Sequence, residues 1–312
     1  MRRDVRVMGN FFVTGELRAD RLAAALAEIF RVVPGDVEVV DTETTDPEGR
    51  NWDALVFCEY EVALGQVSWA LDVYAQDTVT EQPGEAELAR RLAAELRCVV
   101  LHPAAEAPPS AYWLVTPDGR ATRARLYASD DDEPVHSIDA VEDPVPQLPD
   151  VRVALMREVI REQSVPTPVS DVFFHAVEER AKGWAEESGE AVPLDPGPGS
   201  PLWYAGNALG AWEKSVHRVE NDWRPGGRYP ADMYVEDLRA RDRIAELSDA
   251  LPEEFRDLLR ESVDGLDERF GKATRDDGGS ALGAVLGVSR IAMVDKGWWW
   301  HRRPARLPWE GL

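Results

Sequence analysis

Two periods of apolar residues organise the first half of the chain. Residues 17–33 and 84–100 repeat apolar side chains every three or four positions, which is typical of amphipathic helices. On the first of these helices the apolar stripe holds Leu22, Leu26, Ile29 and Val33. Alternation with a period of two, typical of strands, marks 5–15, 37–42, 52–64, 66–76 and 111–127. We therefore predict an α+β fold in which an antiparallel sheet carries two helices, with a β-α-β-β-like order that occurs twice.

The two long strand-like stretches, 52–64 and 66–76, predict a hairpin that turns at Gly65 and Gln66. One face of this hairpin would be apolar, with the cross-strand pairs Cys58–Val73, Tyr60–Leu71 and Val62–Trp69. The opposite face would hold the pairs Phe57–Tyr74 and Glu59–Asp72, with Glu61 one step along.

The carboxylates of Glu59 and Asp72 would face each other directly, which is unfavourable between neighbouring strands. Either an arginine from elsewhere in the chain or a partner protein should compensate them. Because Phe57 and Tyr74 flank the acidic groups, we predict that these four residues and Glu61 form a docking patch for a basic surface. The alternative is a solvated sheet face that tolerates the repulsion.

Residues 129–149 interrupt the alternating pattern. This stretch is acidic, has few large apolar side chains, and contains Pro134, Pro144, Pro146 and Pro149. Such a composition is typical of a linker. We therefore expect an α+β domain over 1–128, a linker over 129–149 and a separate domain over 150–312.

The second half is expected to be mostly α-helical. One apolar stripe at steps of three and four residues holds Leu209, Trp212, Val216, Val219 and Trp223. A later helix would begin after Pro252 and bury Phe255, Leu259, Leu266 and Phe270. Both patterns predict a helical domain.

Three potential metal ligands share one face of the helix that carries Trp212. Glu213, His217 and Glu220 lie at i, i+4 and i+7. Two carboxylates and an imidazole could hold a metal ion through oxygen and nitrogen. The alternative is a solvated helix face with a local Glu–His pair, since a catalytic metal site usually takes ligands from a second segment and none stands out.

Three adjacent tryptophans, Trp298, Trp299 and Trp300, precede a basic segment that includes Arg302 and Arg303. In a strand, the outer two rings would share one face and the middle ring would oppose them. The arginines could then lie across the rings as cation–π partners. One interpretation is a segment packed on the helices. The other is a patch that anchors an interface, with the three tryptophans and Arg302 as binding residues.

Composition limits the function classes. The formal net charge is −23, from 58 acidic and 35 basic side chains. This excess of acid argues against direct nucleic-acid binding and favours a basic protein partner. The two cysteines, Cys58 and Cys98, are too few for a disulfide framework. No apolar run approaches the length of a membrane helix and no signal-peptide pattern is present, so we expect a cytoplasmic protein without a membrane partner.

Motifs that specify a reaction are absent from the sequence. It contains no glycine-rich phosphate loop, HExxH, CxxC or nucleophile elbow. Catalytic residues are therefore unassigned, no cofactor is expected, and the balance favours a protein that is not an enzyme.

The stretches WDALVFCEYEV, VSWALDVYAQD and AYWLVTPDGRATRARLY are followed by the acidic run DDDE. Together they resemble uncharacterised actinobacterial proteins that are often regarded as immunity-type partners of secreted or contact-delivered toxins. The resemblance covers residues 1 to about 140. It implies a stoichiometric toxin-binding protein rather than a catalyst.

The sequence supports three functional hypotheses. The leading one is a non-enzymatic acidic protein-binding module, an immunity-like inhibitor that covers the basic surface of a toxin or nuclease. The second is a small metal-dependent enzyme that uses Glu213, His217 and Glu220. The third is a scaffold or assembly protein whose helical half pairs with itself.

Overall fold

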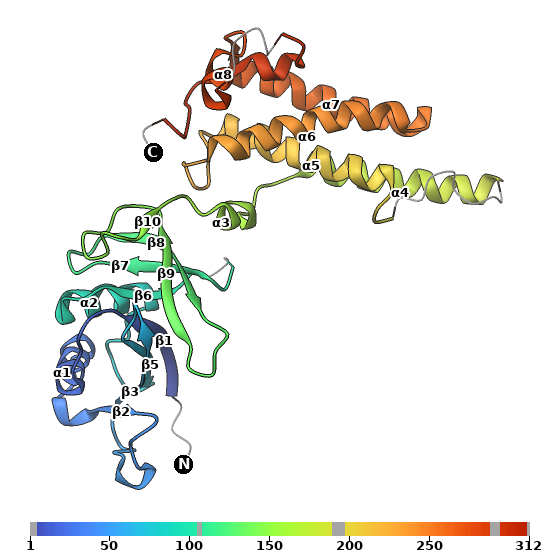
Figure 1. Cartoon of the computed structure of the whole chain (residues 1–312). Helices are drawn as coiled ribbons and strands as arrows, with labels where there is room; N and C mark the ends of the chain where they lie inside the picture. The colour runs from blue at the N-terminus through green and yellow to red at the C-terminus, as the bar shows by residue number, and fades with distance from the viewer. Residues whose placement is uncertain (1–4, 105–107, 189–196, 288–293, 311–312) are drawn as a thin grey trace. The chain divides into compact units, whose positions relative to one another are not determined.

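The computed structural model describes residues 5–104, 108–188, 197–287 and 294–310. The chain divides into two compact units, Met1–Glu162 and Gln163–Leu312. The first contains a sheet with helices and the second is mainly helical, so the chain is α+β overall, as predicted (Figure 1). Among the helices of the described residues, none combines the length and the apolar composition that a membrane span requires.

The first unit contains the predicted strands and helices and several shorter elements. In chain order these are β1 (Val5–Val13), α1 (Ala19–Phe30), β2 (Val37–Asp41), β3 (Val56–Val62), β4 (Leu64–Gly65), β5 (Trp69–Gln76), α2 (Glu85–Leu96), β6 (Val100–Pro103), β7 (Ala111–Val115), β8 (Ala121–Ala128), β9 (Val135–Val141), β10 (Arg152–Val153) and α3 (Arg157–Glu162). The β-α-β-β order occurs as β1-α1-β2-β3 and again as β5-α2-β6-β7. The two sets pair differently, since β2 is an edge strand whereas β6 pairs with β1.

The strands of the described first unit form a ten-stranded mixed sheet. Its order is β10-β9-β8-β7-β6-β1-β5-β3-β2, and β4 pairs with β9 outside this path. Neighbours from β9 to β3 along this path are antiparallel, as predicted. The pairs β2–β3, β4–β9 and β9–β10 are parallel. Between β2 and β3 the parallel pairing requires a long return loop, residues 42–55, because a two-residue turn joins only antiparallel strands.

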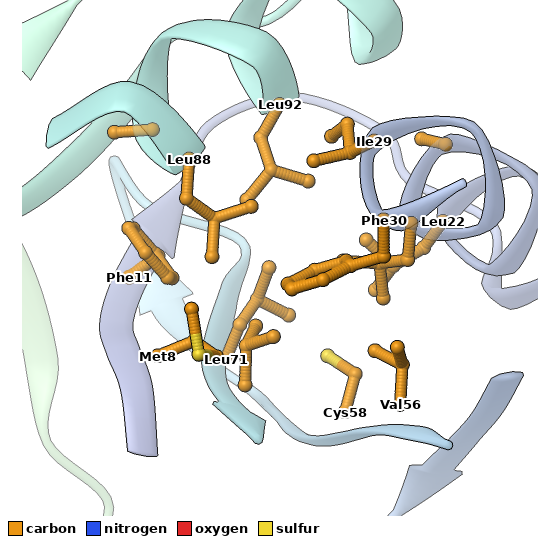
Figure 2. Packing of buried hydrophobic residues seen from close by; sticks show 14 of the residues in the cluster. Met8, Phe11, Leu22, Ile29, Phe30, Val56, Cys58, Leu71, Leu88 and Leu92 are labelled. Carbon is orange, nitrogen blue, oxygen red and sulfur yellow. The ribbon is translucent and has the colours of Figure 1, made fainter. Parts of the chain in front are cut away.

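α1 and α2 cover one face of β1, β3 and β5 and bury the main core of this unit (Figure 2). Large side chains from both helices and all three strands meet there, including Met8, Phe11, Leu22, Leu26, Phe30, Val56, Cys58, Leu71, Leu88 and Leu92. The stripe of α1 is buried as predicted except for Val33. Val33 is exposed because α1 ends at Phe30, where Arg31 takes a left-handed backbone conformation.

A second core lies on the other face of the sheet, between β6, β7, β8 and β9. β4 pairs with β9 through Leu64–Val135 and Gly65–His136, so these strands curve back to the β3–β5 hairpin. The two backbones approach closely, since a Cβ on Gly65 would lie 2.1 Å from the carbonyl oxygen of His136. The predicted turn therefore also joins two distant parts of the sheet.

The expected linker is part of the first unit. Residues 129–149 contain β9, which pairs with β8, β10 and β4 and buries Ile138 in the second core. The boundary between the two units lies after Glu162 and not at 129–149. The acidic and proline-rich positions occupy the turns on either side of β9, whereas β9 itself is a short alternating strand.

The second unit is mainly helical, as predicted. Its elements are α4 (Pro168–Ser188), α5 (Pro201–Glu220), α6 (Ala231–Ala250), α7 (Glu253–Ala273), β11 (Thr274–Asp276), α8 (Ser280–Leu286), a 3-10 turn (Trp298–His301) and β12 (Arg302–Pro304), which pairs with β11. The apolar stripes of α5 and α7 are buried at Leu209, Trp212, Val216, Phe255, Leu259, Leu266 and Phe270, and Val219 is partly buried. Trp223 is also buried, although it lies beyond the end of α5.

Candidate protein-binding site

The β3–β5 hairpin has the predicted register. Its cross-strand partners include Phe57–Tyr74, Cys58–Val73, Glu59–Asp72, Tyr60–Leu71 and Val62–Trp69. α1 and α2 cover the face of Cys58, Leu71 and Val73, and these three side chains are buried. The opposite face carries the predicted docking residues Phe57, Glu59, Glu61, Asp72 and Tyr74. We call these five residues the acid–aromatic face.

Glu59 and Asp72 are both compensated within the chain. Arg50, from the loop between β2 and β3, forms an ion pair with Glu59 at 2.7 Å. The Arg50 guanidinium also lies 4.4 Å from the centre of the Trp52 ring, in a cation–π arrangement. Asn10 of β1 is the cross-strand partner of Asp72 and donates a side-chain hydrogen bond to it. Of the two expected forms of compensation, an arginine from elsewhere in the chain or a partner protein, the arginine is present at Glu59.

The rest of the acid–aromatic face places neutral aromatic rings beside negatively charged carboxylates. Glu61 is exposed, and its Oε1 accepts a hydrogen bond of 3.3 Å from the Thr42 hydroxyl. Burial raises the pKa of Tyr74, and the nearby carboxylates of Asp72 and Glu59 raise it further. Neutral aromatic surface beside carboxylates suits a partner that presents basic and apolar groups together.

Exposed apolar side chains border this face. Val7 is the cross-strand partner of Tyr74 and is 58% exposed, and Trp52 is 59% exposed. Sequence reasoning missed Val7, Trp52 and Arg50. The spacing of Arg50 and Trp52 was visible in the sequence. Their position beside the sheet, however, depends on the loop that joins the parallel strands β2 and β3.

The adjacent tryptophans pack inside the second unit. They form a 3-10 turn and not a strand, so the predicted two-sided arrangement is wrong. Trp299 and Trp300 are buried, and their indole N–H groups both donate to Asp242 of α6, at 2.9 and 3.0 Å. Trp298 is 40% exposed. A binding role for the tryptophans stays a prediction. Of the three rings, that of Trp298 is the accessible one.

Arg302 does not lie across these rings. It donates hydrogen bonds to the Thr274 hydroxyl and to the carbonyl of Gly271 at the end of α7. The cation–π partners are Arg241 of α6 and Lys296, which lies just before the tryptophans. Arg241 lies 4.3 Å from the ring centre of Trp299, and Lys296 lies 4.9 Å from that of Trp300.

Glu213, His217 and Glu220 do not form a set of metal ligands. The buried carboxylate of Glu213 accepts bonds of 2.7 to 2.8 Å from one hydroxyl and two backbone N–H groups at the start of α4. Glu220 forms a two-bond ion pair with Arg269 of α7. Among the described residues, no group of three or more His, Cys, Asp or Glu side chains could hold a metal ion. The helical spacing was correct, but each carboxylate pairs with a different neighbouring helix.

No family model matches this chain, and neither a curated protein nor a solved structure matches it. The resemblance of residues 1 to about 140 to immunity-type proteins therefore stays a prediction.

Proposed function

We propose that this chain is a non-enzymatic, acidic protein-binding module that covers the basic surface of a partner, as an immunity-like inhibitor covers a toxin or nuclease. The supporting observation is the acid–aromatic face, where the rings of Phe57 and Tyr74 lie beside carboxylates on the side of the sheet away from α1 and α2. The charge of the first unit supports the same partner class, since residues 1–162 hold 31 acidic and 16 basic side chains.

Two contributions would hold the partner. Burial of Phe57, Tyr74 and Trp52 would remove apolar surface from water, and aromatic anchors of this kind dominate many interfaces. Negative charge would attract basic groups and speed association. Because Glu59 already pairs with Arg50, a basic side chain of the partner would approach Glu61 or displace Arg50 from Glu59.

Affinity capture of the tagged full chain from its native cell lysate, at low and high salt, tests this function. We expect one near-stoichiometric basic protein at low salt and its loss at high salt. Glu61→Lys should reduce its recovery at least tenfold. Glu261→Lys, at an exposed position of α7, changes the net charge equally and should leave recovery unchanged.

Recovery of no partner at either salt would count against the proposed function, as would a partner equally sensitive to both variants. Sedimentation of the purified chain examines the scaffold hypothesis in the same preparation. That hypothesis predicts a homodimer and no foreign partner.

A further inference from the structure

A second surface of the first unit is strongly exposed and apolar. Four large apolar side chains there have between 44% and 61% of their surface exposed: Val62, Leu64, Tyr127 and Val135. We call these four residues the β4–β9 stripe. A contiguous patch of exposed apolar side chains on a protein surface usually marks a contact with another molecule.

The register of the strands places the four side chains on one face. Leu64 of β4 and Val135 of β9 are cross-strand partners. Val62 precedes Leu64 by two residues and therefore takes the same side of the chain. Tyr127 of β8 is paired with Ser137, which lies two residues beyond Val135 on β9. The stripe thus continues across neighbouring strands without a change of face.

The four side chains of the stripe do not belong to either core of the first unit. The main core ends at the stacked rings of Tyr60 and Trp69, which are 4.0 Å apart and only partly buried. Val62 is the cross-strand partner of Trp69 and already lies outside that core. Ala63, between Val62 and Leu64, and Ile138 of β9 pack in the second core on the other face. The stripe is therefore the outer surface of strands whose inner positions are filled.

An acidic turn borders the stripe. The four residues between β8 and β9 with carboxylate side chains, Asp130, Asp131, Asp132 and Glu133, are all exposed. Backbone hydrogen bonding between Ser129 and Val135 closes this turn and holds it beside the stripe. Within the described parts of the chain, no ion pair joins these carboxylates to a basic side chain. Apolar anchors next to this negative rim are complementary to a segment that carries both apolar and basic side chains.

We propose that the β4–β9 stripe is a second docking surface of this chain, and that it binds a basic segment of a protein partner. Apolar side chains of the segment would cover Leu64, Val135 and Tyr127, while its Lys or Arg side chains would lie against the acidic turn. A second copy of this chain fits less well, because a symmetric contact would bring two acidic turns together. The proposal rests on the proposed function for its partner class, but it assigns a surface separate from the acid–aromatic face.

The test uses the full chain and a fluorescein-labelled dodecapeptide that alternates Lys or Arg with Val or Trp, followed by fluorescence anisotropy. Leu64→Ser with Tyr127→Ser should weaken binding at least tenfold. The control, Val33→Ser with Val172→Ser, removes apolar side chains elsewhere that are more exposed than Leu64 and Tyr127, and it should change affinity less than twofold. Asp131→Asn with Asp132→Asn should also weaken binding and flatten its salt dependence, whereas Asp249→Asn with Asp264→Asn, at exposed positions of the second unit, should not.

Hydrogen exchange of the peptide complex locates the contact. Protection of residues 62–66 and 127–137 supports the proposal. Protection limited to the acid–aromatic face would overturn it and leave the proposed function standing. Failure of the peptide to bind saturably, or wild-type affinity in the Leu64→Ser/Tyr127→Ser chain, would overturn it as well. A homodimer that the same pair of substitutions dissociates would assign the stripe to a second copy instead.

Discussion

Glu59 and Asp72 lie directly opposite each other on β3 and β5, and each has a different partner within the chain. Arg50 pairs with Glu59 at 2.7 Å, and the Asn10 side chain donates a hydrogen bond to Asp72. The repulsion between the two carboxylates is thus offset inside the first unit. We therefore expect this unit to fold without a partner at the acid–aromatic face. Removing the internal cation tests how much the compensation contributes.

Arg50→Ala should lower the free energy of unfolding by about 1–2 kcal/mol, because it leaves Glu59 opposite Asp72 without a cation. Adding Glu59→Gln to this variant should recover part of the loss, since the amide carries no charge. Urea unfolding of the two single variants and the double variant measures this coupling. Strictly additive effects of the two substitutions would show that Arg50 and Glu59 act independently.

Asp242→Ala should destabilise the second unit by about 2–4 kcal/mol, because it leaves two buried indole N–H groups, those of Trp299 and Trp300, without their acceptor. Asp242→Asn keeps a carbonyl acceptor and should lose less. Asp249→Ala, at an exposed position of the same helix, should change stability by less than about 0.5 kcal/mol. Far-UV circular dichroism in urea provides the comparison. Equal effects at both sites would show that the hydrogen bonds from the two indoles to Asp242 do not stabilise the unit.

Glu213→Ala should lower the free energy of unfolding by about 2–3 kcal/mol, since the start of α4 then loses its acceptor for two backbone N–H groups and a hydroxyl. Glu213→Gln should have a smaller effect. His217→Ala should leave stability within about 0.5 kcal/mol of the wild type. A chelator should not shift the unfolding midpoint of the purified protein, and stoichiometric divalent metal lost in His217→Ala would restore the metal hypothesis.

Asp237 should make the second unit less stable as the pH rises. Burial raises its pKa to about 7 from a usual value of 3.8, although hydrogen bonding from Tyr229 and the charge of Arg218 act in the opposite direction. The folded protein therefore holds this proton more strongly than the unfolded chain between about pH 4 and pH 7. The contribution of this carboxyl to the free energy of unfolding is present at the acid end of that window and is lost as the pH rises through it.

Asp237→Asn removes this titration. Compared with the wild type, the variant should gain relative stability as the pH rises from 4 to 8, which denaturant unfolding at several pH values can measure. A constant difference between the two proteins over that range would mean that the carboxyl titrates normally in the folded state.

The sequence by itself determined the local structure. A period of two in residues 52–76, with a turn at Gly65, was sufficient to predict that Cys58 opposes Val73 and that Glu59 opposes Asp72, because a hairpin has only one register for a given turn. The helical stripes of α5 and α7 were likewise predicted, since burial of one face repeats every three or four residues. The composition of residues 129–149 indicated a linker, but the short strand β9 lies there between acidic and proline-rich turns.

Tertiary structure decided what lies opposite each predicted face. Arg50 reaches Glu59 because β2 and β3 are parallel and their loop returns over the sheet. Asp242 meets the tryptophans from a helix more than fifty residues earlier in the chain, and Leu64 is paired with Val135 across a similar separation. Periodicity tells which side of a helix or strand a residue takes, but the partner on that side depends on how distant segments pack. The residues of the β3–β5 hairpin were therefore placed on the correct faces, whereas the three tryptophans, which form a 3-10 turn, were not. In both cases the partners appeared only in the folded chain.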